Sequence, residues 1–444
     1  MRKTIITTAA VVLVAAGCDL GVTNPAQIEA GDLQTPAAVP AIVNGARGSF
    51  GLWTTINGGG GVYTASAMLA DELTHAGSWV PLREISDGVP GNASPENQSH
   101  WNMSQARWQA EDAAEKAANL VANPGTDQWV ALANLYAGFS NRVMGELFCD
   151  AVINGGGLEP HTAFSARAVE YFTEAIQVAQ AGGHADLLSA AYAGRAQARM
   201  MLNQWDQAVA DAGQVATSFV YSHIHSENSG NEHNGVHNWA YRGDNGFQTT
   251  VWGTPFADWG LDTAGNVDSD GDPRATFTSE VRSSTGALIV GGDTRRPFWR
   301  ADKYTARSSG IPLAKGTEMR LIEAEALLRG GNAPGALLKI NEVRAHRSLT
   351  PAVGVTADDV WALLVRERGL ELWLEGRRLG DLRRWADHAP ARPHASYAVP
   401  RGLTAGQPAS ADPRANVLDA SPLCLRVSTN EIFSNPNLNG SNPR

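Results

Sequence analysis

The most regular pattern of apolar and polar positions lies near the end of the chain, from Glu367 to Trp385. Leucines recur there at three- and four-residue steps, which predicts a helix with one buried face. Glu367 and Glu371 would lie together on an adjacent face, and Gly376 and Gly380 then interrupt the pattern. Arginines stand beside tryptophans and leucines in the same stretch. Two interpretations follow: an amphipathic helix with solvated charges, or a paired, partly buried charge cluster.

Helical periodicity dominates most of the remaining chain. Helices are predicted for residues 35–52, 62–73, 101–121, 127–149 and 164–181. Farther along, Ala196 and Ala208 lie twelve residues apart, and Ala324 and Ala336 repeat that spacing. Small residues at these places let two antiparallel helices approach closely, as in tetratricopeptide repeats. We therefore expect a mostly α, tetratricopeptide-like scaffold, with a generic helical array as the alternative.

Three stretches lack helical periodicity. The glycine run at residues 57–61, NGGGG, could in principle bind a phosphate, but it lacks the Lys-Ser/Thr pair of a phosphate-binding loop. We therefore expect a flexible turn there. Residues 75–99 predict a loop that exposes Trp79. Residues 219–309 are rich in Gly, Asn, Asp, Ser and Thr and predict a long irregular excursion from the helical scaffold. Such excursions carry function more often than not.

Composition narrows the class of protein. The 444 residues are 43% hydrophobic, which is globular, and only 18% charged, with a net charge of -10. An acidic chain without a basic patch argues against a nucleic-acid partner. Thirteen tryptophans exceed the eleven phenylalanines and eight tyrosines. Tryptophan is well suited to lie flat against a sugar ring or a planar ligand.

The N-terminus has the features of an export signal. Arg2 and Lys3 precede an apolar run, Ile5 to Ala16, that is too short to span a bilayer. Residues 15–18, AAGC, resemble a bacterial lipobox, in which Cys18 is lipidated and becomes the first mature residue. We expect a signal peptide over residues 1–17 and a lipidated tether over 18–34, which would hold the protein on a membrane. The alternative is a plain signal peptide that ends beside a chance cysteine.

The two other cysteines, Cys149 and Cys424, form an even pair in an exported chain. A disulfide between them is plausible, but spacing alone does not bring their Cα atoms within reach. The question stays open at the level of sequence.

The stretch from Glu367 to Trp385 resembles the signature helix of the SusD/RagB family of outer-membrane nutrient-binding lipoproteins. Leu374 replaces an aromatic residue that is common there. Other elements of the family recur at Asp272-Pro273-Arg274, at Lys303-Tyr304 and in the tail SNPNLNGSNP, residues 434–443. The matching signature positions are Glu367, Arg368, Glu371, Leu372, Glu375, Gly376, Arg378, Asp381, Leu382, Arg383, Arg384 and Trp385.

The resemblance implies a single SusD-like domain over residues 35–444, with a ligand-facing insertion at about 219–309. It further implies a lipid-anchored protein of the outer membrane, at the cell surface, that binds a glycan or peptide nutrient. A SusC-like TonB-dependent barrel would be its partner, and no catalysis is expected. The family uses its signature helix for architecture, so we interpret the charged groups as a buried clamp. The alternatives are a tetratricopeptide-type envelope scaffold for protein partners and a lipid-anchored hydrolase.

The candidate ligand-binding residues are the aromatic side chains of the irregular stretches. A cleft that binds a ligand without converting it needs flat aromatic side chains and a few polar groups that orient the ligand. Each of these residues is equally consistent with a place in the core, so the prediction concerns the group. Its members are Trp79, Trp239, Tyr241, Trp252 and Trp259.

We expect no cofactor and no metal. Four histidines, His223, His225, His233 and His237, suggest a metal site together with nearby acids, but no ligand spacing supports it over a hydrogen-bonded polar loop. The run from Asn266 to Asp272 copies the start of a calcium loop without its final glutamate. A structural Asp-rich turn is favoured there, and a weakly bound calcium ion is the alternative.

Overall fold

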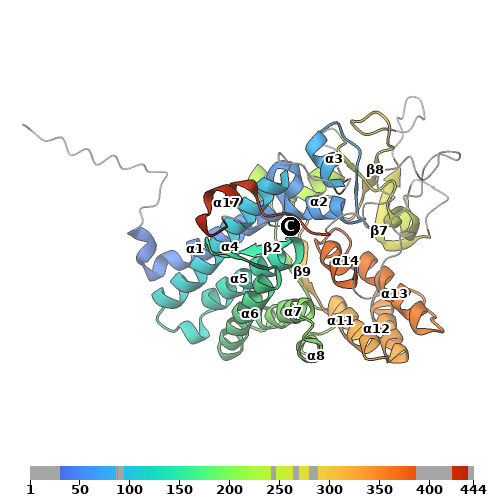
Figure 1. The fold of residues 1–444 in the computed structure, drawn as a ribbon. Helices are drawn as coiled ribbons and strands as arrows, with labels where there is room; N and C mark the ends of the chain where they lie inside the picture. The colour runs from blue at the N-terminus through green and yellow to red at the C-terminus, as the bar shows by residue number, and fades with distance from the viewer. Residues whose placement is uncertain are drawn as a thin grey trace, which may run out of the picture.

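The computed structural model describes residues 31–86, 88, 95–241, 247–263, 270–279, 289–386 and 423–438. The proposed signal peptide and most of the tether, Cys18 included, therefore lie outside the described residues. Helices dominate the described part (Figure 1). One group is formed by α1 (Val39–Gly51), α4 (Pro95–Leu120), α5 (Gln128–Leu147), α6 (Thr162–Gly182), α7 (Ala185–Met201) and α8 (Trp205–Ala212). The second is formed by α11 (Gly316–Arg329), α12 (Ala333–His346), α13 (Ala357–Glu371) and α14 (Arg378–Ala386).

The predicted helical repeats are confirmed. Helix α7 packs against α8, and α11 packs against α12, with Ala196, Ala208, Ala324 and Ala336 completely buried. Helices α5 and α6 form another such pair. Helices α5 and α7 also approach the ring of Phe172 on α6 through glycines. A Cβ added at Gly138 would lie 2.6 Å from this ring, and one added at Gly194 would lie 2.3 Å from it. Small residues at helix contacts thus define the scaffold, as the spacing predicts.

The signature stretch departs from the single predicted helix. Helix α13 ends at Glu371, and α14 begins at Arg378, after a turn. Leu374 and Gly376 have φ angles of 56° and 70°, in the left-handed region that a helix excludes. The chain therefore reverses where Gly376 interrupts the pattern, whereas Gly380 lies inside α14.

Two predicted loops contain helices. The glycine run at residues 57–61 belongs to α2 (Asn57–Leu69), which follows a π-helical turn, η3 (Leu52–Ile56), so the expected flexible turn is wrong. Residues 75–99 contain α3 (Val80–Ser86) and the first turn of α4. Short 3-10 turns occur at η1 (Asp32–Gln34), η2 (Pro36–Ala38), η4 (Pro124–Thr126), η5 (Gly230–Glu232) and η8 (Pro436–Leu438).

The excursion at residues 219–309 is more regular than predicted. It contains α9 (Gly235–Ala240) and α10 (Pro255–Trp259), together with short strands. Strand β4 (Val220–His223) pairs antiparallel with β9 (Ile311–Lys315), and β5 (Thr249–Thr250) with β1 (Thr74–His75). Strand β7 (Asp272–Ser279) lies between β6 (Gly260–Asp262) and β8 (Trp299–Ala301) and contacts α13. Figure 1 shows this region above the repeats α11 to α13.

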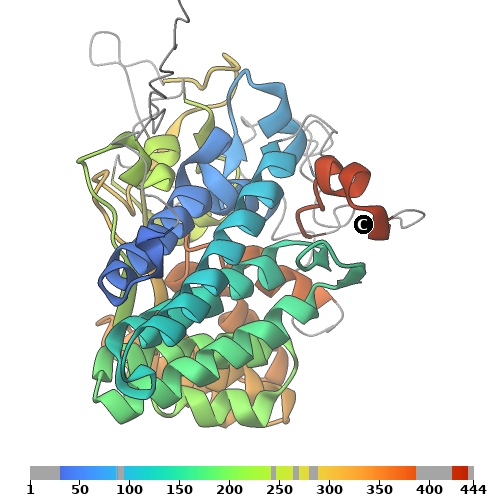
Figure 2. The same ribbon diagram turned by 90° about the vertical axis from the view of Figure 1, so that its left-hand side faces the viewer.

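The C-terminal segment is fastened to the first helical group by a disulfide. Cys149 and Cys424 are bonded, which answers the question that the sequence leaves open. Phe148 pairs with Leu425 in a parallel bridge, and β2 (Asp150–Val152) and β3 (Leu158–Pro160) form a hairpin beside it. Helix α17 (Thr429–Ser434) follows and packs on α4, as Figure 2 shows. In the part of the chain that the structure describes, no helix combines the length and the apolar character needed to cross a membrane.

Candidate functional site

The pairing of β1 with β5 brings the early aromatic residue to the later ones. Gln248 holds the turn after β1: its backbone carbonyl accepts from the N–H of Ala76 at 2.8 Å, and its side-chain oxygen from the N–H of Trp79 at 3.2 Å. A Cβ at Gly77 would lie 1.6 Å from that oxygen, so glycine is required there. Two segments more than 150 residues apart in sequence, as the pairing of His75 with Thr249 shows, therefore share one surface.

Trp79 and Trp239 form the exposed part of this surface. Their rings stack at 6.2 Å between centroids, with 24° between the planes. Trp79 is 41% exposed, whereas Trp239, on α9, is 8% exposed and supports it from within. The carbonyl of Trp239 accepts from Thr249 at 2.8 Å, which couples α9 to β5. The arrangement presents an indole face to solvent on a support that is fixed in place.

Tyr241 follows α9 and is half-buried. One face of its ring stacks on His237 at 4.9 Å between centroids, and the guanidinium of Arg300 lies 4.5 Å from the ring centroid. Arg300 is held by Asp302, whose carboxylate accepts from its Nε at 2.7 Å. This cation–π contact fixes the orientation of Tyr241. Arg300 and Gln248 are polar residues that position the aromatic ones, and no sequence pattern identifies them.

The two remaining candidate residues, Trp252 and Trp259, have a packing role. They are 8% and 9% exposed and belong to the main hydrophobic core, as does Trp239, but in the described part of the chain neither contacts the ring of Trp79 in the way that Trp239 does. The ring of Trp259 packs edge-on against Phe256, and Phe256 stacks on Trp373 of the signature turn. The structure thus brings Trp79 and Trp239 together, places Tyr241 just after α9, and puts the other two tryptophans beneath the surface.

The carboxylates of the signature are buried and paired, as the charge-cluster interpretation predicts. Glu367 and Glu371 are at most 3% exposed. Glu371 accepts hydrogen bonds from Thr317 at 2.7 Å and from Arg347, and Lys315 lies 3.3 Å from it. Burial opposes ionisation of Glu371, but Lys315 and Arg347 outweigh it and hold its pKa far below the usual range.

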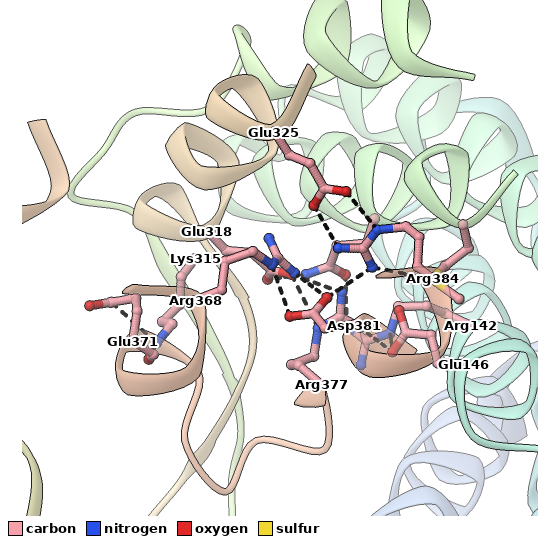
Figure 3. A network of polar contacts seen from close by, with 12 residues as sticks. Arg142, Glu146, Lys315, Glu318, Glu325, Arg368, Glu371, Arg377, Asp381 and Arg384 are labelled. Atoms are coloured by element: carbon pink, nitrogen blue, oxygen red, sulfur yellow. Dashed lines mark hydrogen bonds and ion pairs between the residues drawn. The ribbon is translucent and has the colours of Figure 1, made fainter. Parts of the chain in front are cut away.

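The second half of the signature enters a network that joins both helical groups (Figure 3). Arg368 and Asp381 form a bidentate pair, with both distances 2.8 Å. Arg377 bridges Glu318 of α11, at 2.8 Å, and Glu146 of α5. Arg384 likewise binds Glu325 of α11 at 2.7 Å, and Arg378 binds Asp71, which follows α2, at 2.7 Å. Because each carboxylate has a cationic partner, the group stabilises the fold and is poorly suited to proton transfer.

Two further family elements, Asp272-Pro273-Arg274 and Lys303-Tyr304, converge on the same cluster. Arg274, in the Asp-Pro-Arg element on β7, donates to Glu367 at 2.7 Å. Lys303 binds Glu375 at 2.7 Å, and Lys315 of β9 reaches the same carboxylate at 2.9 Å. The excursion is thereby attached to α13 and to the turn after it. Family signals along the chain thus mark one structural clamp.

The histidine-rich stretch forms separate contacts. His223 and His225 have rings 4.9 Å apart, and burial lowers their pKa values to about 3 and about 4. His237 instead contacts the backbone carbonyl of Tyr304 at 2.7 Å. In the described ranges no group of three or more His, Cys, Asp or Glu is arranged to hold a metal ion. Part of the suggested calcium run, Asn266 and Asp268 included, lies outside those ranges.

Comparison with known proteins identifies the fold. Residues 295–443 match the family model SusD_RagB, of the SusD family. A SusD-like carbohydrate binding protein from Bacteroides fragilis is 15% identical, covers 91% of this chain and 99% of its own, and superposes with a TM-score of 0.67. A SusD superfamily protein from Parabacteroides distasonis is 13% identical over 90% and 98%, with a TM-score of 0.64. Surface glycan-binding protein A from Bacteroides uniformis is 14% identical over 91% and 99%, with a TM-score of 0.59. No curated protein matches by sequence.

Proposed function

Since residues 295–443 match the SusD family model and the fold matches that of SusD-like proteins, we propose that this chain binds a glycan or another oligomeric nutrient. We further propose that it delivers this ligand to a TonB-dependent outer-membrane barrel of the SusC type. Two structural relatives are described as carbohydrate- or glycan-binding, which supports the first part. Lipidation at Cys18 would hold the protein at the surface of the outer membrane.

The observation that carries the proposal is the stack of Trp79 on Trp239. The indole of Trp79 is 41% exposed and stacked on that of Trp239, and Gln248 fixes the backbone of Trp79, so a flat apolar face is presented at little cost in side-chain entropy. A sugar ring offers a matching apolar face and hydroxyl groups at its edge. Tyr241 and Arg300 supply a second aromatic ring and a cation next to α9.

The test is binding of the purified mature protein to panels of oligosaccharides and of peptides, followed by calorimetry on the strongest binder. Trp79→Ala should weaken binding about tenfold or more, equivalent to about 1.4 kcal/mol. Trp101→Ala is the matched control, because Trp101 is also about half exposed, at 51%, but lies on α4. Equal affinities of the two variants would refute the assignment of the site.

Delivery is tested by affinity capture from detergent-solubilised outer membranes of the source organism. A large β-barrel receptor should accompany the protein, and a variant with Cys18→Ala should be lost from the membrane fraction. Capture without such a barrel would remove the support for transport. If saccharide binding were absent as well, a tetratricopeptide-type envelope scaffold would explain the fold better.

A further inference from the structure

A second hollow lies away from the aromatic surface, between α4 and α6, with α5 as its floor. These helices cross the face shown in Figure 2. The hollow has a volume of about 660 Å³, within the range of small-molecule sites. It shares no lining residue with the surface around Trp79. Six of its lining residues matter here: Trp108, Glu111, Asn134, Arg167, Tyr171 and Glu174.

Trp108 stands at the rim and is 53% exposed. It lies on the polar face of α4, where neither the hydrophobic core nor any contact between helices requires an indole. Trp101 is seven residues earlier and similarly exposed at 51%, but it does not line the hollow. An aromatic residue on the polar face of a helix is the signal in the sequence that could have identified this place.

The floor consists of planar polar groups in fixed positions. Glu111 is 8% exposed and accepts from Asn141 and Arg107, each at 2.8 Å, while Arg167 lies 2.9 Å from it. Burial opposes its ionisation, but Arg107 and the hydrogen bonds keep its pKa below the usual range. Asn134 is also buried and donates its amide to the carbonyl of Val130 at 2.9 Å. Both oxygens of Glu111 are taken by its partners, with Arg167 Nε also 3.3 Å from Oε1, so Glu111 positions the guanidinium of Arg167 for a ligand.

The lining of the hollow is acidic, with the carboxylates of Glu111, Asp112, Glu115 and Glu174 against the guanidinium of Arg167. Two arginines, Arg107 and Arg167, compensate Glu111, and Lys116 pairs with Asp112 at 2.7 Å. The carboxylates of Glu115 and Glu174 remain exposed at the rim. A phosphorylated or strongly acidic ligand would be repelled by the exposed carboxylates of the rim. Among ligands without negative charge, a saccharide that is rich in hydroxyls can use both the exposed indole of Trp108 and the polar groups beside it.

We propose that the hollow between α4 and α6 is a second saccharide-binding site, in which Trp108 stacks on a sugar ring and Arg167, positioned by Glu111, and Asn134 hydrogen-bond its hydroxyls. The choice of ligand class rests on the glycan-binding role proposed above. Two sites on one molecule would let it hold a long glycan at two points, which raises the apparent affinity without new contacts.

The test is titration calorimetry with neutral hexasaccharides: malto-, cello-, xylo- and mannohexaose. The wild-type protein should bind one of them at two sites. Trp108→Ala should leave one site, Trp79→Ala should leave the other, and Trp101→Ala should retain both. Trp108→Phe keeps an aromatic face and should recover most of the lost binding. Hydrogen exchange should then show ligand protection within α4 and α6 that Trp108→Ala abolishes.

The outcomes separate this inference from the proposed function. A single site that is lost in Trp79→Ala but unchanged in Trp108→Ala overturns the second site and leaves the first intact. Binding at the α4–α6 hollow alone supports the second site and overturns the role of Trp79. No binding of any hexasaccharide overturns the second site, whereas the proposed function is overturned only if the wider oligosaccharide and peptide panels also fail to bind. A lysine-rich peptide that binds in place of the saccharides, and is lost in Trp108→Ala, would assign the hollow to a protein partner and overturn the inference.

Discussion

Removing the carboxylate of Glu371 should destabilise the protein severely without acting on the ligand site directly. The side chain is 3% exposed and is bound by Thr317, Arg347 and Lys315. Removal of one partner of a buried ion pair costs about 3–5 kcal/mol, because the remaining charge is left uncompensated. Two features place the cost of Glu371→Ala toward the lower end of this range. The side chain of Arg347 is 34% exposed and can regain water, and Lys315 keeps Glu375 at 2.9 Å.

We therefore expect Glu371→Ala to lower the free energy of unfolding by about 3–4 kcal/mol, which includes about 1 kcal/mol for the orphaned hydroxyl of Thr317. The assay is urea denaturation at pH 7, followed by circular dichroism. Glu371→Gln retains an acceptor for Thr317 and should lose less. Glu342→Ala is the matched control: this carboxylate is 40% exposed and pairs with Lys339 at 3.6 Å, so its loss should cost less than about 1 kcal/mol.

The effect should also depend on pH. The folded pKa of Glu371 is lower than the unfolded value, so its stabilisation is complete above about pH 5 and declines as the pH falls toward the folded pKa. The stability gap between the wild type and Glu371→Gln should narrow in acid. A loss below about 1 kcal/mol at pH 7 would refute the clamp. So would a fully stable Glu371→Ala variant that no longer binds ligand.

Two further predictions concern other buried groups. Burial, against the lowering effect of the backbone N–H of Leu374, raises the pKa of Glu72 to about 8. Since the folded state holds the proton of Glu72, the free energy of unfolding should decline as the pH rises from about 4.5 to about 8, by up to about 4 kcal/mol. In urea titrations at several pH values, Glu72→Gln should flatten that slope. An unchanged slope would contradict the raised pKa of Glu72. The Cys149–Cys424 bond closes a separation of 275 residues. The double variant Cys149→Ser/Cys424→Ser should have a free energy of unfolding about 2–5 kcal/mol lower than the wild type, and its C-terminal segment should become sensitive to limited proteolysis. Protease resistance equal to that of the wild type would argue against a stabilising role of the disulfide.

The scaffold could be predicted from local signals. The spacing of Ala196 and Ala208, repeated at Ala324 and Ala336, identifies helix pairs because close helix contacts accept only small residues. Local signals failed where the backbone conformation depends on distant partners. The glycine run at 57–61 predicts a flexible turn, but it forms the start of α2. The signature stretch was expected to be one helix, but the chain turns at Gly376, where a Cβ would lie 2.4 Å from the ring of Tyr63.

The sequence predicts that aromatic residues form the candidate site, but it identifies only some of the residues that do so. Composition and the irregular stretches indicate aromatic ligand residues, and Trp79 and Tyr241 lie where such residues can act. Trp239, Trp252 and Trp259 carry the same signal in sequence, yet all three are buried in the core, and among them Trp239 supports the exposed ring of Trp79. A tryptophan satisfies either environment, so only its neighbours in space distinguish a platform from a packing residue. Gln248 and Arg300 escaped detection because their role depends on the rings that they position.

By itself, the sequence determined what short-range periodicity, spacing and motifs encode: the helical repeats, the charged signature and the likeness to the SusD family over residues 295–443. The tertiary structure decided which opposite charges meet, whether Cys149 reaches Cys424, and which indoles face water. The reason is physical. A helix follows from interactions over three or four residues, whereas an ion pair such as Arg378 with Asp71 joins groups 307 positions apart. Such a contact forms only when the whole fold brings both partners out of water together.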